Sequence, residues 1–328
     1  MSTSITTHAT HLRPVDVRKD LPEIADLIEL CFASTMDADG REYIRQIRRM
    51  AMENRGIGLA IPAARRFVVP IQGYVWTESD HIVGNLTLIP YFKGSKVVYM
   101  IANVAVHPDY RRRGIARQLT QQGINHAREH GASATWLQVR DDNPGATQLY
   151  LSLGFIERAR RTNWTFDSSG QPIPPLTPRV TIRRRTMNDW HFQFRWLQEI
   201  YPPEISWNLP FQINRLQPGF WREFMRWMNG ERMNQWSAWL DDRFLGAAAW
   251  EPGNVVTDVI WLATNPLEED LAAQALLTHA RRILPPHRTV TINFPAGFAV
   301  KGLEAAGFKA HNTLIWMETS FSNPARNG

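Results

Sequence analysis

The stretch that decides the fold is Asn103-Val104-Ala105-Val106-His107-Pro108-Asp109-Tyr110-Arg111-Arg112-Arg113-Gly114-Ile115-Ala116. Its first half continues a β-rich run that ends at Pro108, because proline cannot donate a hydrogen bond inside a central strand. Three arginines and Gly114 follow, and beyond them apolar residues recur at helical spacing to about residue 130. The stretch predicts a strand, a basic loop and a helix in direct succession.

This order of elements favours an anion site at the start of the helix. The first helical turn has N–H groups without a helical partner and lies at the positive end of the helix dipole. Gly114 lets an anion approach the backbone, Ala116 keeps the first turn small, and one of the arginines can pair with a phosphate. Three arginines alone indicate a solvated basic turn, but the complete order favours a phosphate-bearing ligand.

A second motif follows at Gln138-Val139-Arg140-Asp141-Asp142-Asn143-Pro144. Asn143 suits a helix N-cap, and Pro144 suits the first helical position. The helix then has an apolar face that ends at Gly154 and consists of Ala146, Leu149, Tyr150 and Leu153. From its spacing alone, Tyr150 is interpreted as a core aromatic residue with a wet hydroxyl group.

Together the two motifs resemble the GNAT N-acetyltransferase superfamily. Arg111-x-x-Gly114-x-Ala116 is similar to the family's acetyl-CoA signature, Arg/Gln-x-x-Gly-x-Gly/Ala. Asn143-x-x-Ala146-x-x-Leu149-Tyr150-x-x-x-Gly154-Phe155 follows it at a family-like separation. The resemblance covers roughly residues 9–166.

The resemblance implies an acetyl-CoA-dependent N-acetyltransferase with an amine acceptor. It implies that Val104 and Val106 lie on a splayed strand edge along which pantetheine runs. Asn143 is expected on the cofactor side of the next helix, with Tyr150 facing the thiol. The CoA pyrophosphate is expected on the backbone of Arg112, Arg113, Gly114, Ile115 and Ala116, with Arg111 as part of the signature.

The chemistry of acyl transfer suggests a role for Tyr150. A tyrosine has a reference pKa near ~10 and a thiol near ~8.5, so the phenol is suited to protonate a leaving thiolate. We therefore hypothesise Tyr150 as the general acid and a backbone N–H near Val106 as the group that polarises the thioester carbonyl.

The general base has no clear candidate in the sequence. Some family members have a carboxylate where this chain has Met100. The alternatives are a water chain and three residues that are better interpreted as turn residues: His107, Asp109 and Glu78. Cys31 as an acyl-carrying nucleophile has no His or Asp partner nearby in the sequence, which favours a structural cysteine.

The 328 residues correspond to about two domains. A proline-rich segment, 167–178, divides them, because proline fixes φ and lacks an N–H donor. His126-Ala127-Arg128 recurs as His279-Ala280-Arg281, and Gly154-Phe155 recurs as Gly307-Phe308, both at an offset of 153 residues. Looser echoes pair Leu12-Arg13 and Asp20 with Ile182-Arg183 and Asp189, and Trp76 and Gly84 with Trp239 and Gly246.

We therefore predict an α/β fold with a mixed sheet and two GNAT-like domains in tandem, at 9–166 and 179–322, joined by the linker 167–178. In the first domain the patterns predict helices over 21–34, 40–55, 114–130 and 144–153, and strands near 66–76, 82–90, 97–106, 134–140 and 155–166.

The second half is predicted to have lost the cofactor site. Leu267-Glu268-Glu269-Asp270 stands where the first half has arginines and glycine, and carboxylates there would repel a pyrophosphate. The same offset places Leu303 at the position of Tyr150. The second half also has most of the 13 tryptophans, which we interpret mainly as core residues.

The composition sets the remaining expectations. A single cysteine excludes a disulfide framework and Cys/His zinc clusters, so no metal is expected. Met1–Thr10 has no apolar core, and the longest apolar stretch, 97–106, is too short to span a membrane. These features favour a cytoplasmic protein that acts away from membranes.

The net charge of +6 is compatible with an anionic partner, but no nucleic-acid-binding motif accompanies it. We therefore expect no nucleic-acid partner. The main alternative to the enzyme is a non-catalytic acyl-CoA-binding or interaction protein.

Overall fold

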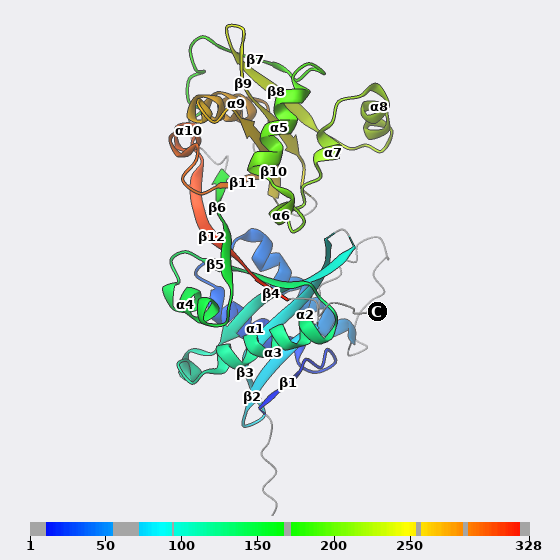
Figure 1. Ribbon diagram of the computed structural model, residues 1–328, viewed down its shortest axis with the longest axis vertical. Helices are drawn as coiled ribbons and strands as arrows, with labels where there is room; N and C mark the ends of the chain where they lie inside the picture. Colours follow the sequence, from blue (N-terminus) through cyan, green and yellow to red (C-terminus); the bar gives the residue numbers. More distant parts are fainter. Residues whose placement is uncertain are drawn as a thin grey trace, which may run out of the picture. The chain divides into compact units, whose positions relative to one another are not determined.

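The computed structural model describes residues 11–54, 72–93, 95–166, 172–253, 257–284 and 288–321 (Figure 1). The contacts divide the chain into two compact units. Unit 1 comprises Met1–Gln138, Pro144–Ile156 and Met317–Gly328, and unit 2 comprises Val139–Asn143 and Glu157–Trp316.

The helices and strands of unit 1 follow the predicted order, with the short strand β1 in addition. Its elements are β1 (Leu12–Pro14), α1 (Leu21–Phe32), α2 (Ala38–Asn54), β2 (Gln72–Glu78), β3 (His81–Lys93), β4 (Lys96–Val106), a 3₁₀ turn (Pro108–Tyr110), α3 (Ile115–Glu129), the start of β5 (Ala134–Arg140) and α4 (Pro144–Ser152). Residues 66–71 of the expected strand 66–76, and 167–171 of the expected linker, lie outside the described residues.

The sheet of unit 1 has the strand order β1-β2-β3-β4-β5. Neighbouring strands pair antiparallel from β1 to β4, and β4 pairs parallel with β5. Helix α3 packs on β2, β3 and β4, and α1 packs on β3, β4 and α2. Apolar residues of α1 and α2 form one core cluster together with Val75, Ile82 and Ala105 from the strands.

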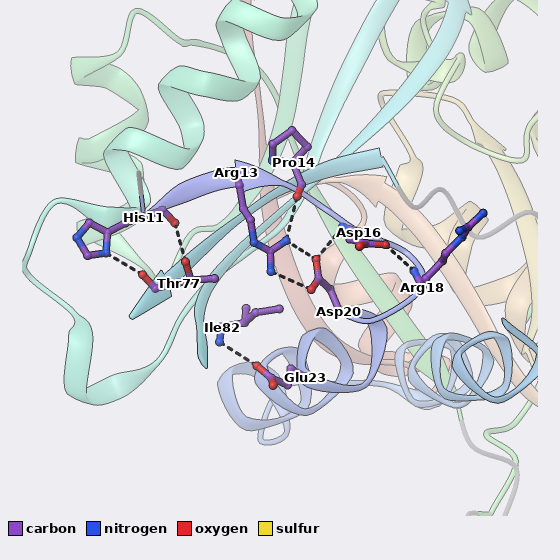
Figure 2. Close-up of polar contacts among 9 residues, drawn as sticks. All are labelled: His11, Arg13, Pro14, Asp16, Arg18, Asp20, Glu23, Thr77 and Ile82. Atoms are coloured by element: carbon purple, nitrogen blue, oxygen red, sulfur yellow. Dashed lines mark hydrogen bonds and ion pairs between the residues drawn. The ribbon is translucent and has the colours of Figure 1, made fainter. Parts of the chain in front are cut away.

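A buried carboxylate fixes the start of α1 (Figure 2). Asp20 is only 2% exposed, and its two oxygens accept hydrogen bonds from Arg13 of β1, at 2.6 and 2.9 Å. The backbone N–H of Asp16 also donates to it, at 2.7 Å. Burial alone would raise the pKa of Asp20, but the bonds from Arg13 and Asp16 outweigh burial and hold the pKa below its usual value.

Unit 2 repeats the plan of unit 1 with additional short helices. Its elements are β6 (Ile156–Phe166), β7 (Val180–Arg184), α5 (Trp190–Ile200), α6 (Pro203–Ser206), α7 (Ile213–Leu216), α8 (Phe220–Met228), β8 (Asn234–Leu240), β9 (Arg243–Glu251), β10 (Thr257–Thr264), α9 (Glu269–Ile283), β11 (Thr289–Pro295), α10 (Val300–Ala305) and most of β12 (Lys309–Ser320).

Local geometry supports the internal repeat. The buried Asp189 lies 3.5 Å from Arg183 and accepts the N–H of Thr186 at 2.7 Å, as Asp20 does with Arg13 and Asp16. The register irregularity after Trp76 in β2 recurs in β8. There Gly246 pairs with Ala238, so Trp239 lies one residue beyond the position that corresponds to Trp76.

Five tryptophans of the second half are buried, as expected for core residues: Trp196, Trp236, Trp250, Trp261 and Trp316. Trp190 and Trp239 are half-buried and pack against the core, whereas Trp221 is 73% exposed.

At β6 and β12, the unit to which a residue belongs by its contacts differs from the half of the sequence in which the residue lies. The part of β6 from Glu157 onward belongs to unit 2, where it pairs antiparallel with β11. Residues from Met317 belong to unit 1, where the N–H of Phe321 donates to the carbonyl of Ser133 at 2.8 Å. The bounds 9–166 and 179–322 therefore describe the repeat along the sequence and stay a prediction.

We expect Asp20→Asn to destabilise unit 1 by about 1–3 kcal/mol, because an amide NH₂ would then face the donors of Arg13 and Asp16. Urea unfolding at pH 7, followed by circular dichroism, measures this loss. Since the pKa of Asp20 is lowered in the folded state, its contribution is complete above the usual carboxyl pKa and disappears as the pH falls through the lowered value.

The matched control is Asp26→Asn. Asp26 is exposed on the same helix and pairs with Arg48 at the surface, so this change is expected to cost about 0–1 kcal/mol. Equal losses for the two variants would contradict the role given to the buried carboxylate.

Candidate functional site

The candidate site begins where β4 and β5 stop pairing. Their parallel register runs from Val98–Ala134 to Ile101–Leu137 and ends there, although β4 continues to Val106. The end of this pairing leaves the last residues of β4 without β5 partners within the described part of the chain. The resemblance to the GNAT superfamily implied a splayed edge at Val104 and Val106, which belong to this unpaired part of β4.

A bulge in β4 accompanies the end of pairing. Asn103 has a positive φ of 51°, which is unusual for a residue other than glycine. Its side-chain Nδ2 donates to the hydroxyl of Tyr43 at 3.0 Å, and its carbonyl accepts Nδ2 of Asn85 at 3.0 Å. These bonds from α2 and β3 hold the strained residue in place. This network could not be predicted from the sequence, because no local pattern marks a bulge at an asparagine.

The backbone of Val106 is directed toward the unpaired edge. The N–H of the next residue, His107, donates to the carbonyl of Val83 in β3 at 2.9 Å. Because backbone groups alternate sides along a strand, the N–H and carbonyl of Val106 point away from β3. The Val106 carbonyl accepts hydrogen bonds from Arg111 Nε, at 3.1 Å, and from the thiol of Cys31, at 3.4 Å.

The loop after β4 presents the start of α3. Gly114 has φ = 79°, and a Cβ built there would meet no heavy atom within 4 Å. The Gly114 carbonyl accepts the first hydrogen bond of the helix, from the N–H of Gln118 at 3.1 Å. The amides of Ile115, Ala116 and Arg117 precede that bond in the first helical turn. Open space and amides that have no carbonyl acceptor within the helix suit an anion.

The three arginines differ in their surroundings. Arg111 is tied to the carbonyl of Val106, and Arg113 donates to the carbonyl of Asp109 at 3.0 Å while its guanidinium lies over the ring of Tyr110. Arg112 is exposed and has no hydrogen-bond or ion-pair partner among the residues that the structure describes. Arg112 is therefore the arginine whose side chain is available to a ligand.

Tyr150 lies buried on α4, 7% exposed, with the ring of Phe155 edge-on to it. Burial raises the pKa of Tyr150 to about 12. Helix α4 is joined to the first turns of α3 by a hydrogen bond from Arg117 to the hydroxyl of Ser152, at 2.6 Å. This bond brings the helix of Tyr150 beside the start of α3.

Asn143 precedes α4 and belongs to unit 2 by its contacts. Its backbone N–H donates to the carbonyl of Arg140 at 3.1 Å, and the helix begins at the next residue, as predicted.

The residues considered as general base have local partners. His107 lies 3.7 Å from Asp109 and accepts its N–H, which is a contact within the turn. Glu78 accepts the indole N–H of Trp76 at 3.0 Å. Met100 is buried within β4. No cluster of His, Cys, Asp or Glu among the described residues could hold a metal ion.

In unit 2 the corresponding helix start is covered. Glu269 accepts the N–H of Ala299 at 2.9 Å, and Asp270 accepts the N–H of Gly302 at 2.8 Å. A Cβ on Gly302 would collide with the backbone of Asp270, so α10 packs directly against the first turn of α9. The acidic residues predicted to repel a pyrophosphate thus bind the start of α10.

Unit 1 is a mixed α/β unit in which β4 parts from β5 and leads through a glycine turn to an open helix start. Residues 38–155 match the model of the acetyltransferase (GNAT) family. This segment is therefore similar to GNAT acetyltransferases, and the match indicates an acyltransferase as the class of enzyme.

Relatives with assigned functions match a part of this chain. The [ribosomal protein bS18]-alanine N-acetyltransferase of Escherichia coli K12 is 41% identical over 69 residues, which are 21% of this chain and 47% of the relative. The mycothiol acetyltransferase of Thermobifida fusca is 35% identical over 85 residues, 26% of this chain and 24% of the relative. The chain thus spans less than half the length of these relatives.

The fold resemblance extends over nearly the whole chain. A GCN5-related N-acetyltransferase from Sphaerobacter thermophilus superposes with a TM-score of 0.57 at 16% identity, covering 95% of this chain and 96% of that one. The likeness confirms the predicted α/β fold, and the repeat described above gives the two GNAT-like domains. No helix in the described ranges is both long and apolar enough to cross a membrane.

The single cysteine offers a probe of the open edge of β4. Burial raises the pKa of the Cys31 thiol, and the nearby Arg111 offsets this only in part. We expect iodoacetamide to alkylate Cys31 at pH 7.5 more slowly than it alkylates glutathione, because thiolate is the reactive form. Mass spectrometry measures the rate, and the protein in urea is the control. Equal rates in folded and unfolded protein would contradict this placement.

Proposed function

We propose that the protein is an acetyl-CoA-dependent N-acetyltransferase in which unit 1 carries the reaction and the amine attacks directly in a ternary complex. The observation that carries this proposal is the continuity of the unpaired edge of β4 with the open start of α3. An extended chain that ends in a pyrophosphate needs both features in this order. The GNAT family match of residues 38–155 supports the same assignment.

Each part of the site has a distinct binding task in this proposal. The edge of β4 from Val104 to Val106 lies along pantetheine, as a neighbouring strand would, with the N–H of Val106 left for the acyl carbonyl because its carbonyl already accepts from Arg111 and Cys31. The amides from Arg112 to Ala116 bind the pyrophosphate at the positive end of α3. Arg112 adds a charged side chain, whereas Arg111 and Arg113 stabilise the loop.

The N–H of Val106 and the hydroxyl of Tyr150 have the chemical roles. The N–H of Val106 polarises the acyl carbonyl and stabilises the oxyanion that forms when the amine attacks. Tyr150 gives its proton to the departing sulfur. A phenol with a pKa of about 12 is a weak acid in water, but the same exclusion of water also raises the pKa of a thiol beside it. The two pKa values rise together, which keeps the proton transfer feasible.

Unit 2 has no catalytic task in this proposal. The start of α9 is occupied by α10, and the position of Tyr150 holds the fully buried Leu303. The acceptor is an amine of a small molecule, a peptide or a protein.

We expect Gly114→Ala to weaken acetyl-CoA binding at least about tenfold, because the loop must leave its positive φ or store strain there. Gly131→Ala is the matched control. Gly131 also has a positive φ, 72°, and no heavy atom within 4 Å of a built Cβ, but it follows the other end of α3. Isothermal titration calorimetry measures binding, and urea unfolding measures stability.

Both changes should cost about 1 kcal/mol of stability. Equal binding in the two variants would show that the start of α3 is not the pyrophosphate site.

We expect Tyr150→Phe to lower kcat by about 10²-fold or more with unchanged acetyl-CoA affinity, because the proton donor alone is lost. Thiol release with a panel of primary amines, peptides and ribosomal proteins measures turnover. Since the pKa of Tyr150 is about 12, its ionisation should cause no loss of activity below about pH 10.

Tyr91→Phe, on β3, is the control and should keep full activity. Full turnover by Tyr150→Phe would exclude the acid role. Acetyl-CoA binding without turnover by the wild type across the panel would favour a non-catalytic acyl-CoA-binding protein.

A further inference from the structure

Unit 2 contains a polar cavity that is separate from the proposed cofactor site. It has a volume of about 310 Å³ and is lined by three arginines, two glutamates, Met233 and Gln235. The lining residues come from the end of β7 and the residue after it, from α8, and from the segment 231–235 that leads into β8. The GNAT chemistry proposed for unit 1 gives this cavity no role.

Arg185 is the buried cation of the cavity. It is only 8% exposed, and it donates through Nε to the amide oxygen of Gln235 at 3.1 Å and through Nη2 to the carbonyl of Leu216 at 2.8 Å. Its Nη1 is buried and has no hydrogen-bond partner within the described residues. A buried N–H donor without an acceptor costs free energy, so the site gains stability from any acceptor that reaches it.

The charges around the cavity leave two cations without a carboxylate. Glu223 pairs with Arg184 at 2.9 Å, and Glu231 pairs with Arg215 at 3.1 Å. Arg226 donates to two neutral acceptors, the carbonyl of Arg215 and the sulfur of Met233. Among the residues that the structure describes, neither Arg185 nor Arg226 forms an ion pair.

Burial and the nearby Arg226 lower the pKa of Arg185 to about 10, as expected for a desolvated cation beside a like charge. The group is still charged at neutral pH. An anion between the two guanidinium groups would relieve both the desolvation and the repulsion.

We propose that this cavity binds a small organic carboxylate, which accepts a hydrogen bond from Nη1 of Arg185 and lies between Arg185 and Arg226. The planar fork of a guanidinium matches the two oxygens of a carboxylate. A singly charged carboxylate fits better than a phosphate dianion, because Glu223 and Glu231 also line the cavity and repel the second charge.

The experiment uses the full chain and titrates sodium acetate, sodium propanoate or inorganic phosphate against sodium chloride at equal ionic strength. The readouts are calorimetry and the ¹⁵N resonance of the Arg185 guanidinium. Wild type is expected to bind acetate or propanoate saturably, more tightly than phosphate, and to shift the Arg185 signal. Arg226→Gln is expected to weaken this binding about tenfold or more.

Arg195→Gln is the matched control, because Arg195 is an exposed arginine on α5 that pairs with Glu199 outside the cavity. It should bind as wild type does. Glu223→Gln should bind the carboxylate more tightly, since a repelling charge is removed, so the proposal remains testable if Arg226→Gln fails to fold.

The proposal is overturned if wild type shows no saturable binding of either carboxylate, if phosphate binds more tightly, or if Arg226→Gln binds as wild type does. Weaker binding in Glu223→Gln would also overturn it.

Discussion

The site depends on one backbone constraint, the positive φ of Asn103 in the middle of β4. In a regular strand Ile101 and Ala105 would point to the same face, because side chains alternate with a period of two. Instead Ala105 packs in the core of α1 and α2, whereas Ile101 lies against Gly123 of α3. The bulge reverses the faces and ends the pairing with β5. A left-handed residue costs about 1–2 kcal/mol, which the bonds to Tyr43 and Asn85 offset.

The same constraint explains why a short loop suffices for the anion site. Once β4 has left β5, its backbone continues into the turn at Pro108 and reaches α3 without crossing another strand. The Val106 carbonyl is the anchor of this path, because both Arg111 and Cys31 donate to it. Hydrogen bonds among the residues that form the strand edge, the loop and the start of α3 therefore also hold these segments in place.

Much of this architecture could be predicted from the sequence. The pattern after Gly114 predicted a helix over 114–130, and α3 runs from Ile115 to Glu129. Periodicity and capping residues are local properties, so they are readable along the chain. The different surroundings of Arg111, Arg112 and Arg113 could not be predicted from the sequence. The partners of Arg111 and Arg113 are carbonyl oxygens whose positions depend on the folded turn. The cavity around Arg185 was missed for a similar reason, since its lining residues come from separate elements.

The two units show how two copies of one fold can keep the residues that stabilise the fold while the copies diverge in function. Each unit has a buried aspartate that ties a strand to the helix after it, Asp20 between β1 and α1 and Asp189 between β7 and α5. The helix starts have diverged, because Gly114 leaves open space whereas Glu269 and Asp270 bind α10. The two aspartates make contacts within their own unit, so a turn that faces a ligand can change in sequence without disturbing them.

The exchange of the final strands has a consequence for synthesis on the ribosome. Residues from Met317 belong to unit 1, although the rest of that unit is translated long before them. The edge near Ser133 that receives Phe321 stays uncovered while unit 2 is being made. Unit 1 is thus begun first and completed last, and the nascent protein must keep an unfinished sheet edge from pairing with other chains until those residues emerge.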